Sequence, residues 1–309
     1  MLGNRTMDAV EIQHVTKTFG PVTAVDDLSL NVPRGSVYGF IGPNGSGKTT
    51  TLRMIMSILL PDSGTIRVLD DDNAAAYTDR IGYLPEERGL YGKMKVRDLL
   101  RFYASLKDGR DVKREVDRWL EKLDLTAWAD KKVEALSKGM SQKVQFIASV
   151  VHRPDVLILD EPFTGLDPVN TDLLQQVVLE LQAEGATVIF STHDMNVAET
   201  MCDFIFMIFK GRKVLDGTLT AIQDQYGTDT VRVRIEGEPR ALHDLPGVEH
   251  VTDRGQVQEL RIAAGRDSQQ LLAAIMSRAR VRSFELARPS LHEIFVRIAG
   301  PAAEEASNA

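Results

Sequence analysis

The chain has 309 residues, enough for one large domain or two modest domains, and its 43% hydrophobic and 26% charged residues are ordinary values for a globular protein. Its net charge of −7 argues against a nucleic-acid binder that works through bulk positive charge, and we expect no nucleic-acid partner. No apolar run approaches the roughly 20 residues of a membrane helix, the first residues lack the apolar core of a signal peptide, and the single cysteine excludes an internal disulfide, so we expect a cytoplasmic protein.

The first motif is a glycine-rich loop between a predicted strand, Val37 to Ile41, and a predicted helix that runs from Thr49 up to Pro61. Glycines let successive N–H groups converge on an anion beside the positive end of a helix. The alternative is a chance glycine-rich turn. The pattern G-x-x-x-x-G-K-[ST] indicates a nucleotide-binding P-loop, in which Lys48 neutralises the β- and γ-phosphates and Thr49 binds Mg²⁺. The loop consists of Gly42, Pro43, Asn44, Gly45, Ser46, Gly47, Lys48, Thr49 and Thr50.

The next part of the chain is helical. The stretches VRDLLRFYASLK and VKREVDRWLEKLDL have helical spacing, and no convincing strand lies between Val96 and Val151. Before and after this part, apolar strand-like runs alternate with helical patterns. The sequence therefore predicts a mostly parallel α/β domain over residues 8–225, interrupted by a helical insertion at about 92–152.

Two carboxylates follow the next apolar strand, VLILDE, at Asp160 and Glu161. Because ligands bind at the carboxyl ends of strands in parallel sheets, Asp160 is placed to hold Mg²⁺ and Glu161 to orient or deprotonate an attacking water. The alternative is a pair of acids that only cap a strand. A further strand, TVIFS, leads to His193, which could reach the γ-phosphate, although a lone histidine is more often structural.

The composition changes near residue 228. The last lysine is Lys213, and the segment beyond residue 228 contains only arginine as a basic residue besides histidine. A short helix that ends near Gly227 is followed by two alternating strands, TVRVRIEG and VQELRIAA, the helix SQQLLAAIMSRA, the strand VRSFELA and a last helix. We predict a small α+β domain at 228–300 and a disordered tail at 301–309.

Taken together, these motifs resemble the ATP-binding cassette (ABC) family of transporter ATPases. The stretch ALSKGMSQKVQFIASVVHRPDVLILDEPFTGLDP is similar to the family's signature, Walker B and D-loop segments in their usual order, and His193 stands at the switch position. The resemblance covers roughly residues 10–219. It implies a P-loop NTPase core with a helical subdomain that hydrolyses ATP with Mg²⁺, and this order of motifs separates the chain from other P-loop proteins.

The resemblance also implies roles for further residues. Phe19 would stack on adenine, Asp167 would bridge a subunit interface, and His193 would sense the γ-phosphate. The signature residues would face the γ-phosphate bound to a second subunit, so that two molecules close head to tail around two ATPs. These signature residues are Ser137, Lys138, Gly139 and Met140.

The chain departs from the family pattern in two places. Lys138 and Met140 replace a glycine and the glutamine of L-S-G-G-Q, and the usual Q-loop glutamine is Glu86 or Glu87. A carboxylate at residue 86 can bind Mg²⁺ or water, but it adds negative charge beside the phosphates, which leaves its duty open. Both departures, with the ending ARPSLHEIFVRIAG, resemble bacterial export cassettes of the sodium-efflux type, which have an appended C-terminal domain.

The resemblance implies two partners, a membrane-spanning permease and a second copy or a paralogous ATPase subunit. The chain would then lie on the inner face of the cell membrane. Leu90, Tyr91 and Met94, near the Q-loop, either contact the permease or pack within the helical insertion. The C-terminal domain would stabilise the dimer, bind a regulator or cover the core. The sequence does not identify the transported substrate.

Two other functions compete with this reading. The first is a soluble cassette ATPase of translation or DNA repair, but such proteins commonly have paired cassettes or a long coiled-coil insertion. The second is a regulatory subunit that binds nucleotide without hydrolysis. Glu161 argues against the second, because a degenerate site would be expected to lose that carboxylate first.

Overall fold

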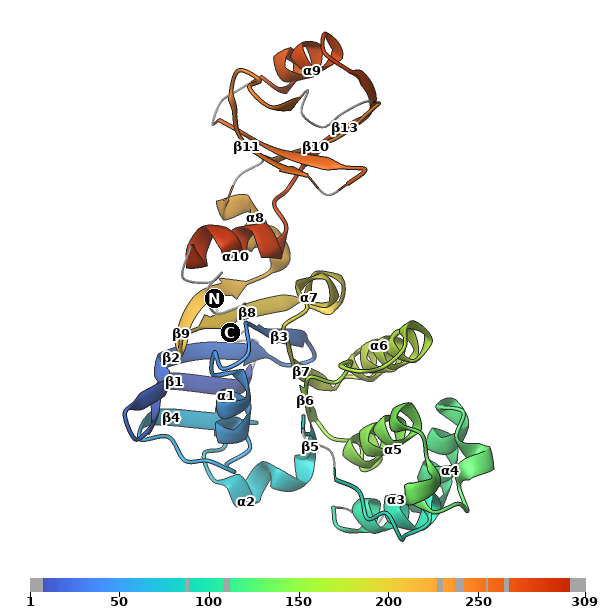
Figure 1. The fold of residues 1–309 in the computed structure, drawn as a ribbon. Helices are drawn as coiled ribbons and strands as arrows, with labels where there is room; N and C mark the ends of the chain where they lie inside the picture. Colours follow the sequence, from blue (N-terminus) through green and yellow to red (C-terminus); the bar gives the residue numbers. More distant parts are fainter. Residues whose placement is uncertain are drawn as a thin grey trace, which may run out of the picture. The chain divides into compact units, whose positions relative to one another are not determined.

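The structure is a computed structural model that describes residues 8–86, 89–107, 112–226, 230–236, 242–253, 255–263 and 267–300. Its contacts divide the chain into two compact units, residues 1–218 and 219–309, and Figure 1 shows the ribbon of both. The predicted disordered tail at 301–309 and the alternative Q-loop residue Glu87 lie outside the described residues.

The boundary between the units differs from the predicted one. The sequence placed helix α8 (Leu219–Gln225) at the end of the first domain, whereas its contacts group it with the second unit. Gln223 Nε2 donates to Pro289 O at 3.0 Å, and Asp224 Oδ1 lies 3.0 Å from Arg288 Nη2. These contacts join α8 to the last part of the chain, which no pattern in the helix itself could reveal.

A six-stranded sheet in the order β5-β6-β7-β3-β8-β9 forms the centre of the N-terminal unit (Figure 1). The first five strands pair in parallel and β9 pairs antiparallel to β8. The predicted mostly parallel α/β core is confirmed. In this order the strands are β5 (Ile81–Leu84), β6 (Val156–Asp160), β7 (Thr187–Thr192), β3 (Val37–Ile41), β8 (Phe204–Phe209) and β9 (Arg212–Gly217).

Both faces of this sheet are buried, which is why its strands are continuous apolar runs. Side chains alternate along a strand, so Leu157 and Leu159 of β6 pack into one core and Val156 and Ile158 into the other. The first core is completed by the long helices on one side of the sheet. These helices are α3 (Val96–Ser105), α4 (Val112–Lys122), α5 (Lys138–Val150) and α6 (Pro168–Ala183).

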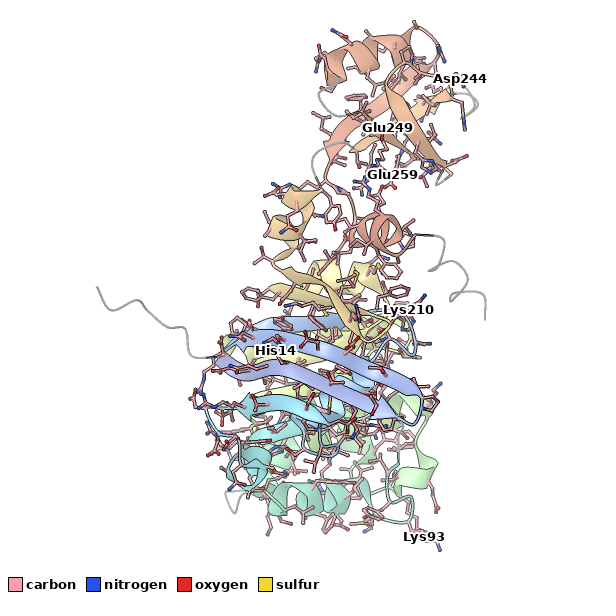
Figure 2. All side chains as sticks on the ribbon, turned by 90° about the vertical axis from the view of Figure 1, so that its left-hand side faces the viewer. His14, Lys93, Lys210, Asp244, Glu249 and Glu259 are labelled. Atoms are coloured by element: carbon pink, nitrogen blue, oxygen red, sulfur yellow. The ribbon has the colours of Figure 1, made fainter. Side chains whose placement is uncertain are left out.

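The second core is completed by helix α1 (Lys48–Ile55) and an antiparallel sheet in the order β2-β1-β4. The sequence analysis missed most of this sheet, which consists of β1 (Asp8–Phe19), β2 (Val22–Pro33) and β4 (Ser63–Val68). Register shifts interrupt the pairing of β1 with β2, and they obscure the simple alternation of a strand. His14 is exposed on this sheet (Figure 2), and its Nδ1 lies 2.8 Å from Oδ1 of the exposed Asp27.

Helix α1 is shorter than predicted. The helix ends at Ile55 rather than near Pro61, because Ser57 has a φ of 55° in the left-handed region. The amides of Ile58 and Leu59 then turn back to Arg53 O, at 2.9 and 3.2 Å. The remaining short elements of the unit are α2 (Ala74–Tyr77), the 3₁₀ turns η1 (Thr78–Arg80), η2 (Thr126–Trp128) and η3 (Val133–Ala135), and α7 (Met195–Met201).

Cys202 caps helix α7 and lies against β3. A Cβ atom added to Gly39 of β3 would come within 2.5 Å of Cys202 Sγ, so the sulfur takes the space that a side chain would need there. Burial raises the pKa of this thiol above its ordinary value. None of the described helices is long and apolar enough to cross a bilayer.

The C-terminal unit contains a four-stranded antiparallel sheet in the order β11-β12-β10-β13. Val231 and Val233 of β10 pack with Leu271 and Ile275 of the helix α9, so the predicted α+β character is confirmed. The sequence analysis missed β11, whose residues are mostly half-buried or exposed. The elements are β10 (Thr230–Glu236), β11 (Val248–Asp253), β12 (Gln258–Ile262), α9 (Ser268–Met276), β13 (Arg280–Ala287) and α10 (Leu291–Ala299).

Gly82→Ala should destabilise the N-terminal unit. A Cβ atom at Gly82 of β5 would lie 2.1 Å from Ser149 O of helix α5, and backbone cannot yield as a flexible side chain can. We expect a loss of about 1–3 kcal/mol in the free energy of unfolding, measured by urea denaturation. Gly92→Ala is the matched control, because its Cβ would meet only Glu134 Cβ at an ordinary 3.6 Å. Equal stability of the two variants would contradict the close approach of β5 and α5.

Candidate nucleotide site

The loop between β3 and α1 lies directly on the backbone of its neighbours. A Cβ atom at Gly42 (φ 157°) would lie 2.3 Å from Ile208 O of β8, and one at Gly47 (φ 112°) would lie 2.5 Å from Ala24 O of β2. Only glycine fits these two positions. The spacing of glycines in the motif is therefore required by packing as well as by any ligand.

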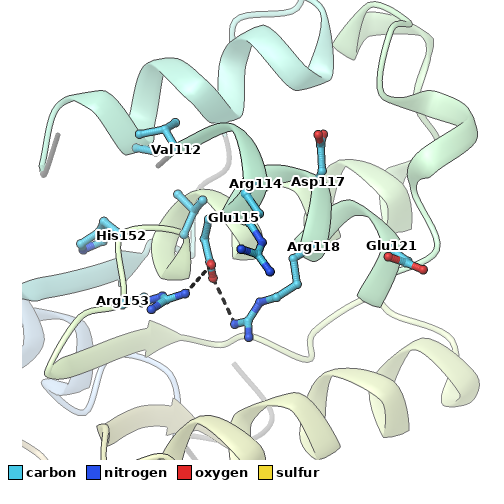
Figure 3. Close-up of a pocket in the computed structure, with 10 residues that line it drawn as sticks. Val112, Arg114, Glu115, Asp117, Arg118, Glu121, His152 and Arg153 are labelled. Atoms are coloured by element: carbon cyan, nitrogen blue, oxygen red, sulfur yellow. Dashed lines mark hydrogen bonds and ion pairs between the residues drawn. The ribbon is translucent and has the colours of Figure 1, made fainter. Parts of the chain in front are cut away.

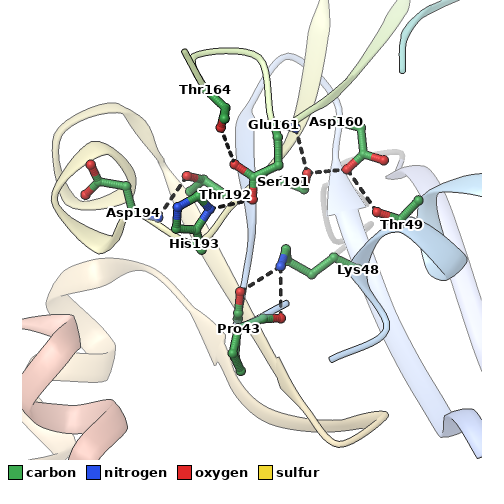
Figure 4. Close-up of polar contacts among 11 residues, drawn as sticks. Pro43, Lys48, Thr49, Asp160, Glu161, Thr164, Ser191, Thr192, His193 and Asp194 are labelled. Carbon is green, nitrogen blue, oxygen red and sulfur yellow. Dashed lines mark hydrogen bonds and ion pairs between the residues drawn. The ribbon is translucent and has the colours of Figure 1, made fainter. Parts of the chain in front are cut away.

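Lys48 reaches back over the loop that precedes it. Its Nζ donates to Gly42 O at 2.7 Å and to Pro43 O at 3.1 Å (Figure 4), and the residue is only 6% exposed. Burial lowers the pKa of Lys48, and the charges of Glu161 and Asp160 act in the opposite direction. The ammonium group is thus held at the loop, near the two carboxylates at the end of β6.

Asp160 is held from two sides at the end of β6. Its Oδ1 accepts from Ser191 Oγ at 2.5 Å and from Thr49 Oγ1 at 3.2 Å (Figure 4). Strand register explains the first contact, since Asp160 of β6 is paired with Ser191 of β7. Asp160 Oδ2 and Ser46 Oγ are buried, and neither has a hydrogen-bond partner among the described residues. Buried polar atoms normally have partners, so both atoms mark places where a ligand fits.

The residues at this point fit Mg²⁺ that arrives with a nucleotide. Within the described part of the chain, no group of three or more His, Cys, Asp or Glu residues could hold a metal ion alone. Mg²⁺ is usually bound by one or two protein oxygens together with phosphate and water oxygens. Thr49 and Asp160 are such a partial set. Glu86 is exposed after β5, and its negative charge acts to raise the pKa of Lys48. No hydrogen bond between Glu86 and Asp160 or Thr49 is present among the described residues.

Glu161 is fixed in an unusual backbone conformation. Its φ of 50° costs about 1 kcal/mol or more for a residue with a Cβ atom. The amide of Glu161 donates to Ser191 Oγ at 2.9 Å, and Thr164 Oγ1 donates to Glu161 Oε2 at 3.0 Å. His193 Nδ1 lies 2.9 Å from Oε1 (Figure 4). The turn therefore aims the carboxylate, Thr164 and His193 hold its two oxygens, and Ser191 holds the backbone amide.

This arrangement suits hydrolysis of a phosphoryl group. A carboxylate with fixed orientation can orient an attacking water or accept its proton, and a cation close by can stabilise phosphate charge. His193 follows Thr192, and its side chain is 55% exposed while that of Glu161 is 9% exposed. The histidine therefore reaches from the surface to the buried carboxylate, and in this structure its partner is Glu161.

Phe19 ends strand β1 and presents an aromatic ring to solvent. The residue is 48% exposed, and Lys17 Nζ lies 5.7 Å from the ring centroid. A large exposed ring of this kind can stack on a nucleotide base. Stacking of Phe19 on adenine stays a prediction.

The signature residues form the first turn of helix α5. Ser137 caps this helix by accepting from Met140 N at 3.2 Å, and both Ser137 and Lys138 are exposed. Asp167 caps α6 in the same way, and the hydrogen bonds from Asn170 hold its pKa below the ordinary value. No hydrogen bond or ion pair of the described structure joins these residues to the P-loop of their own chain. Their role at a second subunit stays a prediction.

The sequence analysis missed two polar residues that hold the site together, namely Ser191 and Thr164. Ser191 binds both Asp160 and the Glu161 amide, and Thr164 binds the Glu161 carboxylate. The only sequence signal for Ser191 was its place near the end of a predicted strand. Its importance depends on the pairing of β6 with β7, which the sequence does not state.

A cavity of about 740 Å³ in the helical insertion belongs to a different part of the unit (Figure 3). Within its lining, Glu115 pairs with two arginines, Arg118 at 3.0 Å and Arg153 at 2.7 Å. His152, which lines the cavity, binds Ile81 O at the first residue of β5. The cavity therefore adjoins the amino end of that strand, whereas the nucleotide residues follow carboxyl ends.

Comparison with known proteins identifies the family of the chain. A family model described as "ABC transporter" matches residues 25–164, and one for the C-terminal domain of DrrA1-3-like ATP-binding proteins matches residues 217–299. The uncharacterized ABC transporter ATP-binding protein YhaQ of Bacillus subtilis is 43% identical over 291 residues, which cover 94% of this chain and 98% of that protein. The chain belongs to the ATP-binding subunits of ABC transporters. Its family hydrolyses ATP, so the predicted family and enzyme class are confirmed.

Other relatives of this ABC subunit have export names. The Nod factor export ATP-binding protein I of Paraburkholderia xenovorans is 35% identical over 301 residues, covering 94% of this chain and 97% of that protein. A solved ATP-binding subunit of an ABC transporter superposes with a TM-score of 0.67 at 30% identity, over 71% of this chain and 93% of that chain. The structure of cbiO1 of Clostridium perfringens, described as part of the transporter complex cbiONQ, superposes with a TM-score of 0.63 at 28% identity. The match covers 71% of this chain and 92% of cbiO1. None of these names mentions sodium, so the sodium-efflux type stays a prediction.

Ser191→Ala should impair turnover more than nucleotide binding. The change removes the donor to Asp160 Oδ1 and the acceptor of the Glu161 amide, so both carboxylates lose their orientation. We expect about a 10–100-fold loss in ATP turnover and a higher Mg²⁺ requirement, measured by phosphate release against Mg²⁺ concentration. Ser149→Ala, a buried serine whose hydroxyl binds Phe146 O within α5, is the control. Wild-type Mg²⁺ dependence in Ser191→Ala would show that Ser191 does not position the acids.

Proposed function

We propose that this ABC subunit hydrolyses ATP in a head-to-tail dimer and thereby energises export through a separate membrane-spanning partner. The observation that carries the proposal is the Glu161 carboxylate, held by Thr164 and His193 beside Lys48 and Asp160. The export names of relatives such as the Nod factor export protein support the direction of transport.

At the site itself, we assign the triphosphate to the P-loop and to Lys48, and the adenine to Phe19. Thr49 and Asp160 would hold Mg²⁺, which neutralises charge on phosphoryl oxygens when it is bound. Glu161 would orient the attacking water and take its proton on the carboxylate. His193 would keep that carboxylate in place and would contact the γ-phosphate from the same surface.

The second half of the site would come from another copy of the chain, or from a paralogous subunit. The exposed first turn of α5, with Ser137 as its cap, offers backbone N–H groups and a positive helix end to the γ-phosphate of the partner. Asp167 would lie at the same interface. Phosphate release would remove the charge that these groups bind, and the dimer would open again.

The membrane partner would dock near the Q-loop, which places the protein on the cytoplasmic face of the membrane. Leu90 and Met94 pack against the core of the helical insertion, which favours a structural role for both. Tyr91 is 58% exposed, and its ring lies 6.2 Å from that of Phe102, which is 40% exposed. We therefore propose Tyr91 and Phe102 as the contact surface for the permease.

For the C-terminal unit, we propose dimer stabilisation or regulation. Its match to the C-terminal domain of DrrA1-3-like proteins shows that related ATP-binding proteins have this domain too. The two rival functions have less support. The matched family and the relatives are transporter subunits, and the supported orientation of Glu161 favours hydrolysis over nucleotide binding alone.

Glu161→Gln should bind ATP, lose turnover by about 10²–10⁴-fold and accumulate as a dimer. The amide keeps the shape of the side chain but cannot take a proton, so ATP would remain between the two copies. Size-exclusion chromatography with ATP and Mg²⁺ measures the dimer, and phosphate release measures the turnover. Glu184→Gln, an exposed residue after α6, is the control. A Glu161→Gln protein that stays monomeric with ATP would count against the closure model.

Lys48→Ala should lose nucleotide affinity. The ammonium group is the cation at the loop, and its removal leaves the triphosphate beside Asp160 and Glu161 without compensation. We expect ATP affinity to fall at least about tenfold, the equivalent of 1.4 kcal/mol, in isothermal titration. Lys210→Ala is the matched control, an exposed lysine whose Nζ lies 5.3 Å from the Phe209 ring centroid. Unchanged ATP binding in Lys48→Ala would refute the P-loop assignment.

A further inference from the structure

Helix α5 is joined to the segment that follows the catalytic carboxylate. Gln142 of α5 is fully buried, and its Nε2 donates to Pro162 O at 2.6 Å. Pro162 directly follows Glu161 in the chain. A single side chain therefore connects the signature helix with the turn that aims Glu161.

A second contact lies one helical turn earlier on α5. Lys138 crosses to the segment 162–167, and a Cβ atom added to Gly165 would lie only 3.1 Å from Lys138 Nζ. A Cβ atom at Gly139 would meet Leu166 and Asn170 at 3.9 Å, which is ordinary contact. The segment 162–167 thus runs along the amino end of α5 with direct packing.

The segment 162–167 also binds the side chain of Glu161. Thr164 lies between Pro162 and Gly165, and its Oγ1 donates to Glu161 Oε2 at 3.0 Å. A shift of α5 that carries Pro162 O with Gln142 would therefore alter both the backbone of Glu161 and the hydrogen bond to its side chain. The left-handed φ of Glu161 makes its orientation sensitive to the position of Pro162.

We propose that Gln142 is a positioning residue that couples the two ATP sites of the dimer. The inference rests on the proposed function, in which α5 binds the ATP of the partner while Glu161 acts on the ATP of its own chain. Because Gln142 ties α5 to the Glu161 turn, binding of the partner's ATP to α5 sets the orientation of Glu161 in the first site. Occupation of one site then activates the other, which is a two-site coupling in the thermodynamic sense.

The test is the ATP dependence of turnover by the full-length chain. We expect cooperative turnover in the wild type, with a Hill coefficient well above one, and a coefficient near one in Gln142→Met. Methionine is unbranched and of similar length, but it cannot donate to Pro162 O. The control is Ser149→Ala, which removes a buried hydroxyl from the same helix without touching the segment 162–167.

Gln142→Glu provides a second variant of the same shape. A buried carboxyl group has a raised pKa and can donate only when it is protonated. The cooperativity of Gln142→Glu should therefore match that of the wild type at about pH 5.5 and be lost by about pH 8.5, with the wild type measured at each pH as the reference.

Three results would overturn the inference. These are a wild-type Hill coefficient of one, unchanged cooperativity in Gln142→Met, and cooperativity in Gln142→Glu that does not vary with pH relative to the wild type. Failure of the proposed function itself would be seen separately. In that case Glu161→Gln would not form the ATP dimer, whereas loss of the coupling alone leaves the dimer of Glu161→Gln/Gln142→Met intact.

Discussion

The site depends on the register of three parallel strands. Ile41 of β3 is paired with Thr192 of β7, and Asp160 of β6 is paired with Ser191 of the same strand. All three strands therefore end together, and the loop after each one supplies a different chemical group at one edge of the sheet. If one of these strands shifted by one residue against its neighbour, each buried side chain of that strand would point to the opposite core. The two hydrophobic cores thus fix the catalytic geometry, because they permit only one register.

Charge is the second constraint on the site. The buried ammonium of Lys48 lies near two acids that the sheet holds in place, and Glu86 adds negative charge from the side of β5. One buried ammonium thus faces three carboxylates, so a bound triphosphate would need more positive charge than Lys48 alone supplies. A divalent cation and the positive helix end of a second subunit would both correct this balance. The electrostatics and the proposed dimer thus support each other.

The sequence was most informative where chemistry is local. Lys48 and the acids after β6 belong to short motifs in which neighbours in the chain are neighbours in space. Ser191 and Gln142 could not be identified in this way, since their partners lie 31 and 20 residues away and depend on sheet order and helix packing. Irregular backbone hid other features. Bulges concealed β1 and β2, and the left-handed Ser57 ended α1 before its apolar pattern did.

The lone cysteine of the chain has a practical consequence. Cys202 is half-buried against Gly39 and burial raises the pKa of its thiol, so it should react slowly with thiol reagents and oxidants. The natural protein is thus already a background for cysteine chemistry. One new cysteine at Ser137 and another beside the P-loop would then be the faster-reacting thiols, and a disulfide between chains would report the distance between the two halves of a shared site directly.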